Sequence, residues 1–102
     1  MKKKGEPMNK KQAVMVTTKH RGVFFGYVEK IPTGKTINLE RARMAVYWSA
    51  DMGGILGLAS KGPSASCKIG PAVPEILLQD VTSCTKVSDA AAAKWEASTW
   101  MQ

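Results

Sequence analysis

Two arginines one position apart, Arg41 and Arg43, are the residues best spaced for binding chemistry in this sequence. Residues two apart in an extended chain point to the same face, so both guanidinium groups could hold one phosphate bidentately. A second concentration, residues 20–27, interleaves cations, aromatic rings and glycines. Aromatic faces stack on bases while cations meet phosphates, so the combination suits a nucleotide-like anion. The predicted ligand-binding residues are Arg21, Phe25, Tyr27, Arg41, Arg43 and Trp48.

The same aromatic residues have a structural interpretation that competes with ligand binding. The chain has two Phe, two Tyr and three Trp, so a domain of this size needs most of them for its core. Strand alternation also places Phe24 and Phe25 on opposite faces. If one packs inside, the other is exposed or buried between subunits. The pattern therefore predicts that the domain covers its second sheet face by forming a homo-oligomer.

Catalytic signatures are missing, so we expect a protein that is not an enzyme. Gly57 and Gly62 have the spacing of a phosphate loop, but Pro63 stands where that motif needs its lysine. There is no nucleophile elbow, and the single histidine, His20, falls in a predicted turn. The carboxylates are scattered singly, without a pair suited to general acid and base chemistry.

The two cysteines decide little beyond excluding a zinc site, and we predict neither a metal nor a cofactor. Cys67 and Cys84 lie seventeen positions apart, and one histidine is too few for a four-ligand zinc site. A disulfide between them is geometrically possible. In a reducing cytosol, however, two free thiols are expected.

The net charge of +7 is concentrated near the N-terminus. Residues 1–11 contain five lysines and one glutamate, a net charge of +4. We therefore predict a flexible basic arm over residues 1–12 and a single β-rich domain over residues 13–102. The arm is interpreted either as a solvated tail or as a nucleic-acid contact, since phosphate attraction requires only positive charge. Its basic residues are Lys2, Lys3, Lys4, Lys10 and Lys11.

Hydropathy indicates a cytoplasmic protein without a membrane partner. No apolar run is long enough to cross a bilayer, and the basic start is not followed by the apolar stretch of a signal peptide. The folded part is mildly basic. This charge suits an anionic small molecule and an acidic protein surface equally well.

The patterning predicts a mainly β (α+β) fold: a small antiparallel, partly closed sheet or barrel of five strands with one short C-terminal helix. Gly26 inside the second strand indicates a bulge, a bend, or the close approach of another backbone or of a ligand. A short helical turn or an apolar loop is expected over 53–60. Ser88 is the predicted N-cap of the C-terminal helix, and Trp95 should anchor that helix to the sheet. The expected strands cover residues 13–18, 23–29, 36–39, 41–48 (where a helix is the alternative) and 75–87.

Several runs resemble a family of small uncharacterised tailed-phage and prophage proteins, over about residues 13–97. They include HRGVFFGYVE, INLERARMAVYWS with its Tyr47-Trp48 pair, GILGLASKGP and the Val73-Pro74-Glu75-Ile76 strand start. The resemblance implies no agreed activity and no catalytic residues. A weaker likeness to Sm-like barrels, which bind single-stranded RNA as rings, rests on the hairpin over 14–26 and on Ile37-Asn38-Leu39. The chain lacks the N-terminal helix and the second RNA-binding motif of those barrels.

Small phage proteins without catalytic residues often bind stoichiometrically against host defences. Taken together with the arginines and aromatic residues of 20–27 and 41–43, this habit predicts a non-enzymatic phage accessory protein that binds an anionic nucleotide-like ligand, with sequestration of a host immune signal in the host cytoplasm as its expected role. One alternative is a protein-binding inhibitor of a host defence complex, similar to an anti-CRISPR protein. Another is nucleic-acid binding through the basic arm, and a role in the virion also stays open.

Overall fold

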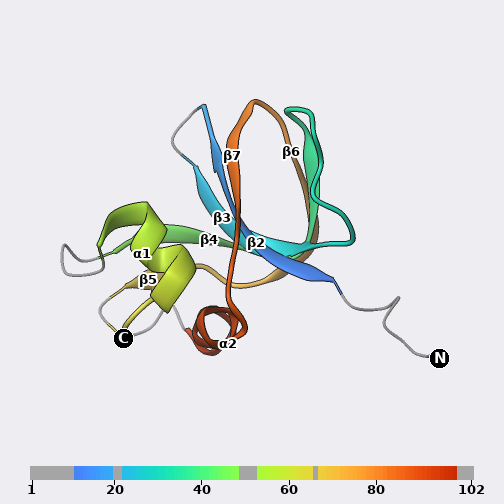
Figure 1. Cartoon of the computed structure of the whole chain (residues 1–102). Coiled ribbons are helices and arrows are strands. Elements are labelled where there is room, and N and C mark those ends of the chain that lie inside the picture. The colour runs from blue at the N-terminus through green and yellow to red at the C-terminus, as the bar shows by residue number, and fades with distance from the viewer. Residues whose placement is uncertain (1–10, 20–21, 49–52, 66, 99–102) are drawn as a thin grey trace.

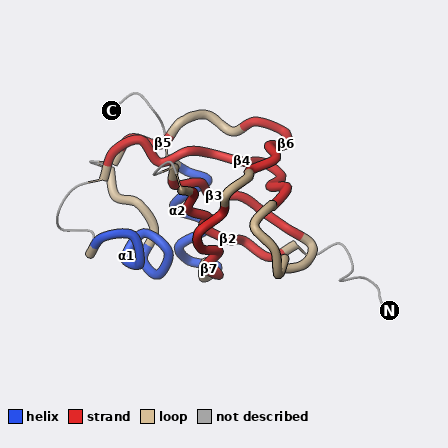
Figure 2. The backbone as a smooth tube through the Cα atoms, turned by 90° about the horizontal axis from the view of Figure 1, so that it is seen from above, coloured by secondary structure: helices blue, strands red, loops and turns tan. Residues whose placement is uncertain are grey.

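One curled antiparallel sheet carries two helices on its outer side (Figure 1). The computed structural model describes residues 11–19, 22–48, 53–65 and 67–98. Figure 2 shows both helices on the side of the sheet away from β6. The elements are β2 (Gln12–Thr18), β3 (Val23–Val28), β4 (Ile37–Tyr47), α1 (Gly54–Lys61), β5 (Lys68–Ile69), β6 (Val73–Leu78), β7 (Val81–Lys86) and α2 (Asp89–Ala97).

The order of the strands explains why the sheet curls. The order is β5-β4-β3-β2-β7, and β6 pairs with the first half of β4. Only Gln79 and Asp80 separate β6 from β7, although these two strands pair with β4 and β2 respectively. A two-residue connection brings the two edges of the sheet together at that turn. Asp80 permits the turn by adopting a φ of 56°, a conformation that Asp tolerates.

The mainly β fold with an antiparallel sheet and a short C-terminal helix is confirmed, with corrections of detail. The sheet has six strands instead of five and is not closed, because β6 and β7 do not pair with each other in the described part of the chain. The long strand predicted over 75–87 is divided by the turn at Asp80. The strands predicted over 36–39 and 41–48 are one strand, β4. Residues 54–61 form a second helix, α1.

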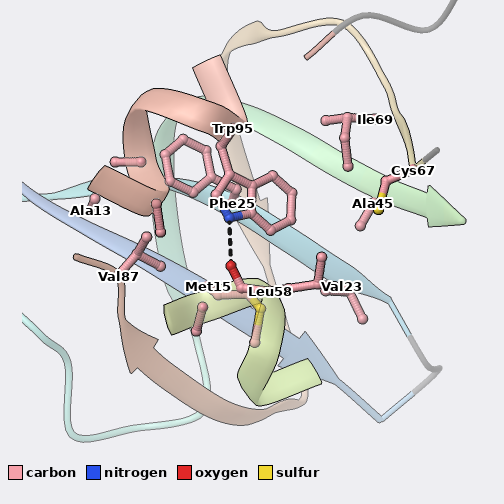
Figure 3. Close-up of a cluster of buried hydrophobic side chains, with 13 residues drawn as sticks. Ala13, Met15, Val23, Phe25, Ala45, Leu58, Cys67, Ile69, Val87 and Trp95 are labelled. Atoms are coloured by element: carbon pink, nitrogen blue, oxygen red, sulfur yellow. Dashed lines mark hydrogen bonds between the residues drawn. The ribbon is translucent and has the colours of Figure 1, made fainter. Parts of the chain in front are cut away.

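The outer face of the sheet is buried beneath the helices (Figure 3). Trp95 of α2 is fully buried, and its ring stacks on Phe25 at 5.0 Å between centroids. The Trp95 indole Nε1 donates a hydrogen bond of 3.1 Å to the Leu58 carbonyl of α1. This bond satisfies the one polar atom that burial of the indole would otherwise leave without a partner. The prediction that Trp95 anchors α2 to the sheet is confirmed.

The inner face of the sheet forms a second core within the same chain. Val14, Val16, Leu39 and Leu78 are buried there, and Phe24 packs against them. Phe24 and Phe25 therefore point to opposite faces, as alternation predicts. The curl of the sheet covers the inner face beside the first half of β4, whereas Met44 and Val46 in the second half stay exposed. The oligomeric state itself stays a prediction.

Candidate functional site

A bulge in β4 positions the two arginines. The β3–β4 register shifts between Phe25 and Tyr27, opposite Arg41, which adopts a φ of 51°. Gly26 faces this bulge, and a Cβ there would lie 2.9 Å from the Cβ of Leu39. The predicted bulge and close approach at Gly26 are thus confirmed. The extra residue in β4 turns both Arg41 and Arg43 toward α2, as their contacts with residues 95–98 show.

Arg43 holds the C-terminus of α2. Its side chain is 8% exposed, and Nε donates to the Gly70 carbonyl at 2.7 Å. Nη1 donates to the carbonyls of Trp95 (2.6 Å) and Glu96 (3.1 Å), and Nη2 donates to that of Ser98 (2.7 Å). The last carbonyls of a helix lack partners within it and carry partial negative charge, which a guanidinium satisfies.

Two of the predicted ligand-binding residues are therefore structural. Arg43 has four of its five N–H groups committed to backbone carbonyls, so the phosphate clamp that the Arg41–Arg43 spacing predicted is not formed. Phe25 has no exposed surface and lies between Trp95 and Tyr27, whose ring meets it edge-on at 5.3 Å. A base cannot stack on a ring that both neighbours already cover.

Tyr27 and Arg41 share a partner on α2. The Tyr27 hydroxyl donates a hydrogen bond of 2.6 Å to Oε2 of Glu96, and the Arg41 guanidinium forms an ion pair with the same carboxylate. The Arg41 guanidinium also lies 4.8 Å from the centroid of the Tyr27 ring, a cation–π arrangement. Burial, reinforced by the hydrogen bond to Glu96, raises the pKa of Tyr27 to about 12. The exposed charge of Arg41 is thus already neutralised within the chain.

A groove runs between α2 and the first two strands, and we call it the α2 groove. It has a volume of about 610 Å³. Lys11 lies at its edge, with Nζ 2.6 Å from Oε1 of Glu40 and 4.0 Å from Oε2 of Glu29. The hydrogen bond to Glu40 raises the pKa of Lys11. The lining residues are Lys11, Gln12, Ala13, Tyr27, Glu29, Asp89, Ala92, Ala93 and Glu96.

The folded part of the chain begins earlier than residue 13. Gln12 is the first residue of β2. Lys11 pairs with Glu29, which follows β3, and with Glu40 of β4. Lys11 therefore acts as a residue of the domain and not of a solvated arm. The other predicted arm and turn residues lie outside the described residues: Lys2, Lys3, Lys4, Lys10 and Arg21.

Two apolar hollows meet at the Gly22 end of the β2–β3 hairpin, and we call them together the hairpin-end surface. Phe24, Met44, Leu77 and Leu78 line the first hollow. Val23, Trp48 and Ile55 line the second, which shares Thr18 and Gly22 with the first. Trp48, the sixth predicted site residue, is half-buried against the outer core and forms one wall.

Met44 was not recognised from the sequence, because its alternation is that of a core residue. Leu77 was also missed; it lies opposite Asn38, and both residues are exposed. Met44 is 42% exposed and Leu77 is 58% exposed. β6 pairs with β4 only from Ile37 to Ala42, so the second half of β4 is left uncovered on its inner face. A local pattern does not reveal where the neighbouring strand ends.

The described residues contain no group of three or more His, Cys, Asp or Glu side chains able to hold a metal ion. Both cysteines are free, and burial raises the pKa of the Cys84 thiol. Neither described helix has the length and apolar character needed to span a membrane.

The chain belongs to a family defined by a domain of unknown function, DUF6948, which matches residues 11–95. This match covers most of the folded domain and agrees with the extent of the resemblance noted from the sequence. Comparison with curated proteins and with solved structures gives no significant match.

Proposed function

We propose that this protein is a non-enzymatic binding protein whose partner is another protein, held at the hairpin-end surface. The observation that carries the proposal is the exposure of Met44 and Leu77 beside an apolar hollow. Large apolar side chains grouped around a hollow are typical of protein interfaces, where a few such residues supply most of the binding energy.

The charge near this surface favours an acidic partner. The Gln79–Asp80 turn borders the first hollow, and Lys19 and Lys35 flank it: the Lys19 N–H donates to the Asp80 carbonyl, and the Lys35 carbonyl accepts from the Val81 N–H, each at 2.9 Å. Both lysine side chains are exposed, and two lysines against the single carboxylate of Asp80 leave a net charge of +1 at this turn. With a net charge of +7 for the whole chain, an acidic segment that carries an apolar anchor is the complementary partner.

A protein partner accounts for the geometry better than a nucleotide-like ligand does. Phe25 and Arg43 are committed to the core and to α2, while Arg41 is paired with Glu96. The resemblance to small phage and prophage proteins supports a stoichiometric role, such as inhibition of a host defence complex in the host cytoplasm.

Selection from a randomised peptide library tests the proposal, because the library samples many acidic and apolar sequences at once. Peptides selected on the wild-type protein should combine an apolar anchor with acidic residues. Leu77→Asp should weaken their binding by about tenfold or more, because it places a charge in the anchor site. Val73→Asp is the matched control, since Val73 lies on the same strand and is also exposed (43%) but lies outside the surface. Equal binding to both variants, or a selection without such a consensus, would reject the proposal.

A further inference from the structure

The α2 groove concentrates negative charge in a basic protein. Four of the chain's eight acidic residues, Glu29, Glu40, Asp89 and Glu96, line it or pair with Lys11 at its edge. The cations that face them are Lys11, paired with Glu29 and Glu40, and Arg41, paired with Glu96. Four carboxylates against two cations leave a local excess of negative charge. Within the described residues, Asp89 forms no ion pair.

The N-terminal segment starts at this groove. Lys11 is the first described residue and also lines the groove, so residues 1–10 are tethered to its edge. That segment contains four lysines and one glutamate, a net charge of +3. Ten extended residues reach about 33 Å, which exceeds the roughly 14 Å length of the nine-residue helix α2.

We propose that residues 1–10 bind along the α2 groove of their own chain, with lysines paired to Glu29, Asp89 and Glu96. Exposed ion pairs are individually weak. Tethering at Lys11 supplies an effective concentration in the millimolar range, so several weak pairs suffice. The bound lysines are then withheld from polyanions, and a nucleic acid must displace the segment from the groove. The α2 groove shares no lining residue with the hairpin-end surface, so this inference is independent of the proposed function.

Zero-length carbodiimide cross-linking of the full-length chain, read by mass spectrometry, tests the contact directly. We expect Lys2, Lys3 or Lys4 to be joined to Glu29, Asp89 or Glu96 in a dilute monomer, and the products to disappear at about 1 M salt, where the Debye length is about 3 Å. Cross-links found only between molecules would overturn the proposal. So would products as frequent at Glu75, which lies on β6 outside the groove.

A matched pair of charge variants tests the consequence for polyanion binding. Glu29→Gln and Glu75→Gln each remove one exposed carboxylate, so they change the net charge equally. If the groove holds the segment, Glu29→Gln should raise the affinity for a single-stranded oligonucleotide by about twofold more than Glu75→Gln does. Equal effects of the two variants would contradict the competition.

Discussion

At the scale of single residues, Arg41 and Arg43 show how identical side chains on one strand acquire different roles. Both are directed toward α2 by the bulge opposite Gly26. Arg43 is buried and donates to four backbone carbonyls, whereas Arg41 stays exposed and pairs with one carboxylate. Exposed ion pairs are weakened by water, but a buried guanidinium cannot be removed without leaving its carbonyl partners unsatisfied.

This difference predicts unequal effects on stability. Arg43→Met should lower the free energy of unfolding by about 2 to 4 kcal/mol, because several buried carbonyls lose their donor. Arg41→Gln should lower it by less than about 1 kcal/mol. Urea denaturation of the two variants measures both values. Similar losses would show that the network around Arg43 does not stabilise the C-terminus of α2.

Tyr27 should titrate unusually late. Its pKa is raised to about 12 in the folded protein from an ordinary value of 10, so the folded state binds the phenolic proton more tightly than the unfolded state does. The stabilisation is therefore complete below about pH 10 and is lost as the pH rises toward 12. In a titration followed by phenolate absorbance, Tyr27→Phe should remove the component with a midpoint near pH 12. A wild-type curve without that component would contradict the assignment.

At the scale of elements, the lengths and junctions of neighbouring strands and helices decide which surfaces are exposed. β6 covers only the first half of β4, and this leaves Met44 open to a partner. The end of α1 is set by Gly62, which adopts a φ of 83° where the chain passes beneath α2. A Cβ at Gly62 would lie 2.8 Å from both the Ala91 carbonyl oxygen and the Cβ of Lys94.

The junction between the helices should therefore tolerate no side chain. Gly62→Ala should destabilise the protein by more than about 1 kcal/mol, since it combines a left-handed conformation with a backbone clash. Gly34→Ala is the control, because nothing lies within 4 Å of a Cβ at that position. Thermal unfolding monitored by circular dichroism compares the two. A Gly62→Ala protein as stable as the control would mean that α1 and α2 can move apart to accommodate the added methyl group without loss of stability.

At the scale of the whole molecule, charge and apolar surface are segregated. The acidic residues of the α2 groove lie beside β2 and β3 where the chain begins, whereas the hairpin-end surface lies around Gly22 and carries lysines at its border. The two proposed contacts, one with residues 1–10 and one with an acidic partner, therefore use separate surfaces. The peptide selection and the cross-linking experiment address these two sites separately.

Features that depend on neighbouring residues could be predicted from the sequence. Alternation placed Phe24 and Phe25 on opposite faces, the glycine at position 26 marked the bulge, and Ser88 was identified as the N-cap of α2, where its side chain accepts a 3.1 Å bond from the Ala91 N–H. Each of these follows from backbone geometry within a few residues or from a single strand pair.

Tertiary packing, in contrast, determines which of the candidate binding residues are available to a ligand. The hydrogen-bond partners of Arg43 lie 27 to 55 positions away along the chain. The exposure of Met44 depends on where β6 stops, and Phe25 is covered by Trp95 of a distant helix. Residue type and spacing indicate what a side chain can bind. The packing of remote elements determines whether its hydrogen-bond donors or ring faces are already used within the chain.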